Sequence, residues 1–238
     1  MSTATFPHRR SPVGSGPDAE PDASAEHSLA ERLLAERRAL PGAAIRITTS
    51  TLMSSEDLHA ADRFGAGFDV DTRGEIDRLE REGIPITGCI HIRPETPMAE
   101  ITGAYLRGVR VFVIGDAREL ENFRELPEVA VLVRIEFDRS RRRTAGTAPR
   151  AAAAVVRACR AAGIRVAGFT VGFGCRGVVQ PLRIRRAIAL MRRLERAECG
   201  GFDTLDLDFA SARPIAHGLR RAVHGASRRY RVSARRTA

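Results

Sequence analysis

The sequence contains no lysine, although lysine is normally among the commonest residues. All 39 basic residues are therefore arginine, and the formal net charge is +10. Asn122 is the only asparagine, so codon bias in a GC-rich genome can explain both shortages. Codon bias alone would not remove a lysine that chemistry required.

Other absences limit the class of protein. The four cysteines form no CxxC pair, and they are Cys89, Cys159, Cys175 and Cys199. Because the sequence shows no export signal, we expect the thiols to be reduced and the protein to be cytoplasmic. No run reaches the roughly 18 apolar residues of a membrane span, whereas an apolar fraction of 43% is enough for a folded core.

The two ends of the chain differ from its middle. Residues 1–26 are rich in Ser, Pro, Ala and Asp without an apolar segment, which predicts a disordered leader. Residues 227–238 carry five arginines, which predicts a disordered basic tail, and a second basic stretch lies between Asp138 and Arg150. Tyr230 is the only aromatic residue in the tail, and no nucleic-acid motif is present, so we do not expect nucleic-acid binding. The folded domain is predicted over residues 27–226.

Short β-branched runs alternate with longer segments of helical period, which is typical of repeated βα units. Strands are predicted at Ala44–Thr49, Gly67–Val70, Ile86–Ile92, Arg110–Ile114, Val129–Glu136, Arg165–Val171 and Thr204–Phe209. Helices are predicted at Ser28–Ala39, Ser55–Phe64, Arg73–Glu82, Met98–Arg107, Ala117–Glu125, Arg150–Ala162, Leu182–Glu198 and Ile215–His224.

The predicted fold is an α/β barrel of the TIM type with seven βα units. An open doubly wound sheet would give a similar pattern, but the even spacing favours the barrel. One strand is missing from the usual eight, and open strand edges are normally covered. The leader, the basic tail, a second copy or another protein could close the gap.

Four ordered motifs resemble the ornithine, diaminopimelate and arginine decarboxylases, the fold-type III pyridoxal enzymes related to alanine racemase. They are Gly65-Ala66-Gly67-Phe68-Asp69-Val70 with Gly74-Glu75-Ile76, Val131-Leu132-Val133-Arg134-Ile135, Gly168-Phe169-Thr170-Val171-Gly172-Phe173-Gly174-Cys175, and Leu207-Asp208-Phe209-Ala210-Ser211-Ala212-Arg213-Pro214. The resemblance covers about residues 29–214. It implies a barrel that binds pyridoxal phosphate (PLP), and it also implies a C-terminal β-domain that this sequence lacks.

The resemblance also implies residues that are missing here. The family's Schiff-base lysine at the end of the first strand aligns with Ser50, or with Thr48 or Thr49 if a gap is allowed. None of these side chains is an amine, and a lapse of selection for that lysine is compatible with codon bias. We therefore expect no cofactor and exclude a covalent PLP link.

Further cofactor contacts of the family are replaced. Its ring-stacking histidine aligns with Thr170 and a serine aligns with Phe173. The three glycines that let backbone N–H groups approach the phosphate align with Ala210, Ser211 and Ala212.

Three motif residues of the family's pocket are retained, namely Asp69, Glu75 and Arg134. They could form a residual ligand pocket at the barrel mouth. Alternatively, Asp69 caps the following helix, Glu75 completes its first turn and Arg134 pairs with a neighbour such as Glu136. We favour the second interpretation.

A metal site is not expected. Cys89, His91 and His59 could be imagined as ligands, but Cys-x-His without a second pair is a weak pattern.

The sequence favours a pseudoenzyme that binds a partner, such as an active decarboxylase or another biosynthetic enzyme, through the open barrel edge. One alternative is PLP-independent chemistry at the barrel mouth, using Asp69, Glu75, Arg134 and the thiol of Cys175. Another is a truncated decarboxylase homologue without a function.

Overall fold

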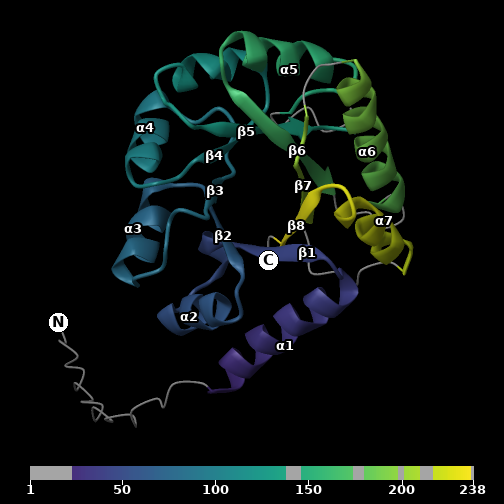
Figure 1. The fold of residues 1–238 in the computed structure, drawn as a ribbon. Helices are drawn as coiled ribbons and strands as arrows, with labels where there is room; N and C mark the ends of the chain where they lie inside the picture. The colour runs from purple at the N-terminus through teal and green to yellow at the C-terminus, as the bar shows by residue number, and fades with distance from the viewer. Residues whose placement is uncertain (1–22, 138–145, 174–179, 198–200, 210–216, 237–238) are drawn as a thin grey trace, which may run out of the picture.

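The computed structural model describes residues 23–137, 146–173, 180–197, 201–209 and 217–236. Eight strands form a closed, all-parallel barrel in the order β1 to β8, with the helices outside it (Figure 1). The strands are β1 Ala43–Thr48, β2 Gly67–Val70, β3 Ile90–His91, β4 Val111–Ile114, β5 Ala130–Ile135, β6 Arg165–Phe173, β7 Thr204–Phe209 and β8 Arg231–Arg236.

Seven α-helices and two 3₁₀ segments are present in the described part of the chain. They are α1 Ala23–Ala39, η1 Thr49–Thr51, α2 Ser55–Arg63, α3 Arg73–Arg81, α4 Met98–Leu106, η2 Ala117–Phe123, α5 Ala152–Ala161, α6 Gln180–Arg196 and α7 His217–Ser227. The α-helix predicted from Ala117 is thus a 3₁₀ segment. The first helix begins at Ala23, inside the predicted leader, and it packs on α2 and β1.

Local sequence signals explain several helix boundaries. Ser54 caps α2 by accepting a hydrogen bond from the Asp57 N–H at 3.0 Å, and Thr72 caps α3 in the same way. Gly83 and Gly163 follow the ends of α3 and α5 with φ of 71° in both cases, a conformation that favours glycine.

The predicted TIM-type barrel is confirmed, but it has eight strands and not seven, and it is closed. Of the four candidates for closing the gap, the basic tail is the one that does so. The predicted disordered tail supplies β8, which pairs with β1 from Ala43↔Val232 and with β7 from Thr204↔Arg231. Val232 and Ala234 face the helices, while Ser233 and Arg235 face inward, so the segment alternates as a barrel strand must. No open edge is left between β1 and β7 for another chain to fill.

The core has two shells. The larger cluster lies between the strands and the surrounding helices and includes Phe112, Ile114 and Leu207. A small apolar cluster fills one side of the barrel interior and consists of Ile90, Val113, Ala130, Leu132 and Ala167. The other side of the interior is charged. No helix in the described ranges is long and apolar enough to cross a membrane.

Candidate functional site

The charged half of the barrel interior is formed by β1, β2, β5, β7 and β8. A TIM-type barrel usually fills its interior with branched apolar side chains and places its site at the carboxyl ends of the strands. Here three carboxylates and three guanidinium groups lie in the interior, where apolar side chains are usual. They belong to Asp69, Asp206, Asp208, Arg46, Arg134 and Arg235.

Arg235 on β8 is the centre of this cluster. Its side chain is only 1% exposed, and it reaches three carboxylates. The Nη1 atom lies 3.1 Å from Asp69 Oδ2, and Nη2 lies 3.3 Å from Asp206 Oδ2 and 3.4 Å from Asp208 Oδ2. A guanidinium is always charged and offers five donors, so it can bind several carboxylates at once.

Asp69 is shared between two arginines on neighbouring strands. Arg46 and Arg235 are register partners on β1 and β8, and both point to Asp69. Arg46 Nε donates to Asp69 Oδ1 at 2.6 Å, and Arg46 also donates to the carbonyls of Phe68 and Gly88. A Cβ at Gly67 would lie 2.6 Å from Arg46 Nη1, so the glycine provides the space for this arginine.

Asp206 is held by two hydroxyl groups in addition to Arg235. Thr170 Oγ1 donates to Asp206 Oδ2 at 2.7 Å, and Ser233 Oγ donates to Asp206 Oδ1 at 2.6 Å. All three side chains are buried. Thr170, which aligns with the family's ring-stacking histidine, is therefore part of the ion network.

Arg134 on β5 completes the cluster. Its Nη2 lies 3.2 Å from Asp208 Oδ2, and both side chains are largely buried. The predicted ion pair of Arg134 is thus made with a carboxylate on β7 and not with Glu136. The pairing joins strands that are distant in the sequence.

Three carboxylates and three guanidiniums give the cluster no net charge when all are ionised. Burial raises the pKa of Asp69, against the opposing effect of Arg46 and Arg235. Burial lowers the pKa of Arg235, but Asp206, Asp69 and Asp208 raise it further, so it ends above its usual range. Arg235 is therefore a permanent cation inside the barrel.

Three buried polar atoms of the interior have no hydrogen-bond partner among the described residues. They are Thr48 Oγ1, Arg134 Nε and Arg235 Nε. Each can donate, so the interior keeps three donors beyond those that the ion pairs use.

The three residues aligned with the family lysine lie at different places. Thr48 ends β1 with its side chain on the same, inward side as Arg46, and its Cα is the register partner of Asp69. Thr49 is buried and donates to the Asp69 carbonyl at 2.9 Å. Ser50 is exposed and hydrogen-bonds to Glu75. Thr48 is therefore the residue that faces the interior.

The retained Glu75 has a local structural role. Its Oε2 accepts a hydrogen bond from the Asp71 N–H at 2.5 Å, while its own N–H donates to Thr72 Oγ1 at 3.3 Å. This arrangement stabilises the first turn of α3, as the second interpretation expected. Asp69 does not cap that helix, since Thr72 does. Burial is the largest influence on Glu75 and raises its pKa.

Several predicted positions cannot be placed. Ala210, Ser211, Ala212 and Cys175 lie outside the described residues, and so does the side chain of Phe173. The Phe173 backbone ends β6 beside Phe209.

The imagined metal ligands are not brought together. His59 Nε2 lies 3.2 Å from Glu82, and the His91 ring stacks on Phe112 at 5.6 Å. Within the described ranges, no group of three or more His, Cys, Asp or Glu side chains could hold a metal ion.

Five members of the network were not singled out from the sequence, namely Arg46, Asp206, Asp208, Ser233 and Arg235. Asp206 carried a usable signal, because Leu-Asp-Leu-Asp-Phe alternates with the period of a strand and puts both aspartates on one face. Arg235 lay in a segment predicted to be disordered.

Comparison with solved structures identifies the fold. Lysine/ornithine decarboxylase from Vibrio vulnificus, complexed with putrescine, matches with a TM-score of 0.75 and 22% identity over 89% of this chain and 61% of that one. SrLDC in complex with PLP and cadaverine matches with a TM-score of 0.78 and 20% identity over 89% of this chain and 58% of that one. The arginine decarboxylase of Paramecium bursaria Chlorella virus matches with a TM-score of 0.75 and 14% identity over 89% of this chain and 62% of that one.

The chain thus spans about three fifths of the length of these structural neighbours. No curated protein sequence that was compared matches it. A family model does match, namely the pyridoxal binding domain of the pyridoxal-dependent decarboxylases, over residues 27–207.

The match corrects the prediction that no cofactor belongs to this protein. The matched domain is described by its pyridoxal binding, and one neighbour of the same fold was solved with PLP. The expectation of a cofactor-free protein therefore has no support from the comparisons. With most of its length matched by this one model, the chain belongs to the pyridoxal-dependent decarboxylase family.

Proposed function

We propose that this chain is a pseudoenzyme of the decarboxylase family, in which the barrel interior has a structural role and the outer surface binds a protein partner. The observation that carries the proposal is Arg235, a buried arginine bound to three carboxylates in the interior.

The described residues do not fit lysine-linked chemistry. The inward side chain at the end of β1 is a threonine, and the chain contains no lysine elsewhere. A hydroxyl cannot form the imine by which a pyridoxal enzyme exchanges its lysine for the substrate amine.

The retained pocket residues are also committed to other contacts. Asp69 binds two arginines, Arg134 binds Asp208, and Glu75 binds backbone N–H groups at the start of α3. A general acid or base needs to be free to exchange a proton with substrate. This argues against the alternative of PLP-independent catalysis by these three groups.

The partner is not expected at the barrel edge, because β8 occupies it. A binding function must therefore use the outer surface.

Incubation with PLP and a panel of basic amino acids tests the catalytic half of the proposal. We expect no PLP-dependent release of CO₂ and no borohydride-stable adduct within the barrel. The N-terminal amine can react without any site, so peptide mass spectrometry must locate each adduct. Turnover above that of a heat-denatured sample would overturn the proposal.

The variant Thr48→Lys returns an amine to the inward position. If the interior is rebuilt around Arg235, Thr48→Lys should gain no aldimine absorbance band. A band in this variant that is absent from Ser50→Lys would show that only the lysine had been removed from an intact site.

A further inference from the structure

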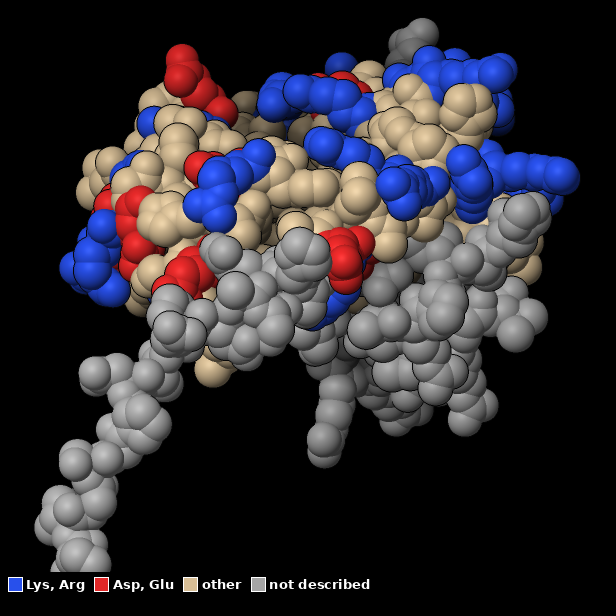
Figure 2. All heavy atoms as spheres, turned by 90° about the horizontal axis from the view of Figure 1, so that it is seen from below, with Lys and Arg blue, Asp and Glu red and all other residues tan. Residues whose placement is uncertain are grey.

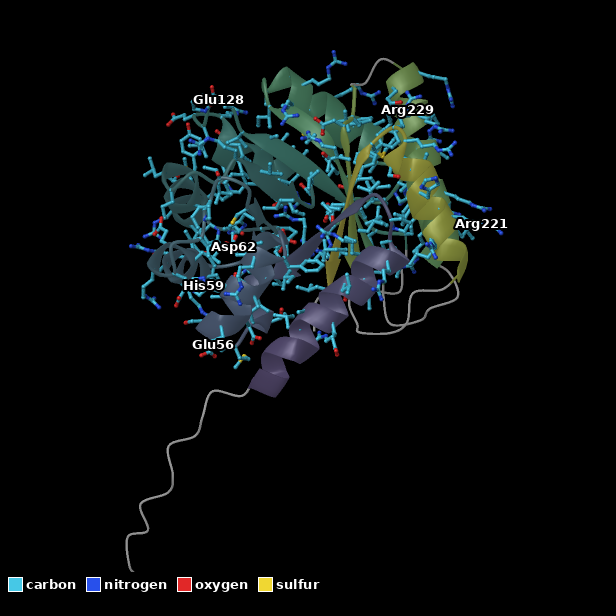
Figure 3. The ribbon with its side chains drawn as sticks, turned by 60° about the horizontal axis from the view of Figure 1, so that its bottom comes forward. Glu56, His59, Asp62, Glu128, Arg221 and Arg229 are labelled. Carbon is cyan, nitrogen blue, oxygen red and sulfur yellow. The ribbon has the colours of Figure 1, made fainter. Side chains whose placement is uncertain are left out.

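The outer surface over α6 and α7 is densely basic. The described exposed arginines of these two helices are Arg185, Arg186, Arg192, Arg193, Arg196, Arg220 and Arg221. Figure 2 shows arginines gathered on the right, the side where Figure 1 places α6 and α7. Figure 3 shows Arg221 and Arg229 on that side, away from Glu56 and Asp62 of α2.

A hollow of about 530 Å³ lies between the two helices on this surface. Arg185, Arg192 and Arg196 line it from α6, and Arg221 lines it from α7. We call this hollow with its four arginines the arginine groove.

The groove exists because small residues face each other across it. Ala189 on α6 lies opposite Ala222 and Gly225 on α7, and together with Ile188 and Tyr230 they make an apolar floor. No atom lies within 4 Å of where a Gly225 Cβ would be. Side chains this short leave the space between two helices unfilled.

The groove arginines have no carboxylate partner in the described part of the chain. Glu195 is the only acidic residue in α6 or α7, and it is bound to Arg229 at 2.7 Å and to the Tyr230 hydroxyl at 3.4 Å. Four guanidinium groups around one apolar floor therefore offer their charge outward. Guanidinium groups bind carboxylates and phosphates with two parallel hydrogen bonds.

The length of the groove excludes a small anion as its full occupant. Arg185 and Arg196 are eleven residues apart on one helix, which is about 16 Å at the rise of an α-helix. An extended peptide covers that distance with about five residues.

The floor favours a peptide over a nucleic acid. Single-stranded nucleic acids bind by stacking their bases on exposed aromatic rings. The one aromatic residue of the groove, Tyr230, is only 3% exposed and so offers no such platform. A floor of Ile188 and alanines suits aliphatic side chains instead.

We propose that the arginine groove binds an acidic segment of a partner protein, with carboxylates on the arginines and an aliphatic side chain on the floor. This inference rests on the proposed partner-binding function and names the surface and the chemistry of that partner.

Fluorescence anisotropy with labelled six-residue peptides tests the groove. The peptide of alternating glutamate and leucine should bind more tightly than that of alternating glutamate and glutamine, which has the same charge. An oligouridylate of equal charge should bind more weakly than the leucine peptide. Equal binding of the two peptides, tighter binding of the RNA, or no binding at all would overturn the proposal.

Matched variants separate the groove from the general charge of the surface. Arg192→Glu with Arg196→Glu should weaken the leucine peptide about tenfold or more, since two attractions become repulsions. Arg186→Glu with Arg193→Glu makes the same charge change on α6 outside the groove lining and should cost about twofold or less. Equal effects of the two pairs would show general attraction only.

A second pair of variants tests the space itself. Gly225→Leu fills the groove and should abolish the preference for the leucine peptide. Gly103→Leu is its control, because this helical glycine in α4 also has no atom within 4 Å of its Cβ position. Unchanged binding by Gly225→Leu would contradict the proposal. So would a wild-type chain that is a dimer in solution and becomes a monomer in the double variant Arg192→Glu with Arg196→Glu.

These readouts involve neither PLP nor turnover. If the chain binds the peptides and also decarboxylates amino acids, the groove proposal stands and the pseudoenzyme proposal fails. If the chain is inactive and does not bind the peptides, the pseudoenzyme proposal stands and the groove proposal fails.

Discussion

Replacing Arg235 with methionine removes the central cation of the barrel interior while keeping a long apolar side chain. The carboxylates it leaves are not equivalent. Asp69 keeps Arg46 and Asp208 keeps Arg134, whereas Asp206 keeps only the hydroxyls of Thr170 and Ser233. The energetic cost should therefore be concentrated on Asp206.

The size of the effect follows from that difference. Removing one partner of a buried ion pair costs about 3–5 kcal/mol, because the remaining charge is buried without compensation. We expect Arg235→Met to lower the free energy of unfolding by that amount at pH 7, since one carboxylate loses its only cation.

Urea unfolding followed by far-UV circular dichroism at pH 7 measures this loss. The control is the double variant Arg235→Met with Asp206→Asn, which removes both charges and should recover much of the loss at pH 7. Asp206→Asn alone leaves Arg235 with two carboxylates, and we expect it to cost less than Arg235→Met.

Two results would refute the reasoning. One is an Arg235→Met chain as stable as the wild type at pH 7. The other is a double variant no more stable than Arg235→Met, because the damage would then come from lost packing around the arginine and not from the unpaired carboxylate.

Three further predictions follow from buried groups. Burial lowers the pKa of His91 below its unfolded value of about 6.5, because the folded protein favours the neutral ring. The contribution of His91 to folding stability is therefore fully present above about pH 6.5 and is lost as the pH falls toward the folded pKa. His91→Phe should flatten the unfolding free energy between pH 7 and pH 5, and an unchanged slope would contradict this. A Cβ at Gly168 would lie 1.7 Å from a backbone carbonyl oxygen of β7, so Gly168→Ala should cost more than about 3 kcal/mol. In the same urea titration Gly103→Ala should be neutral or stabilising by up to about 1 kcal/mol, and equal effects of the two glycine variants would count against the clash. Burial raises the pKa of Cys89 and of Cys159 to about 11, so both thiols should resist iodoacetamide at pH 8 in the native state and react in urea, as peptide mass spectrometry can show. Rapid native labelling of either one would be the contrary result.

Much of the barrel was predictable because its signals are local. Buried runs such as those of β4 and β5 are apolar enough to identify without neighbours, and caps such as Thr72 mark where a helix starts. The motif resemblance then drew attention to Asp69 and Arg134, although the favoured interpretation gave them local roles and the structure places them in the ion network of the interior.

The eighth strand was not predictable by the same means. Its segment has only two inward and two outward side chains to show alternation, and arginine is ordinarily a solvent-exposed residue. Arg235 is stable inside the barrel only because Asp69 and Asp206, far away in the sequence, arrive there with opposite charge. Such a partnership depends on tertiary structure and leaves no local pattern.

The arginine groove was hidden for a related reason. The periodicity of α6 shows which residues share a face, but not that α7 places Ala222 and Gly225 opposite Ala189.

The pairing of β1 with β8 has a consequence for folding during synthesis on the ribosome. Every other strand pair joins neighbours in the sequence and can form while the chain is still growing, but this pair joins segments near opposite ends of it. Until β8 emerges, the nascent chain exposes the unpaired edges of β1 and β7 and leaves Asp206 without its cation. Barrel closure must therefore be a late step that follows the emergence of β8, and the interval before it is when the chain is most exposed to aggregation and most dependent on chaperones.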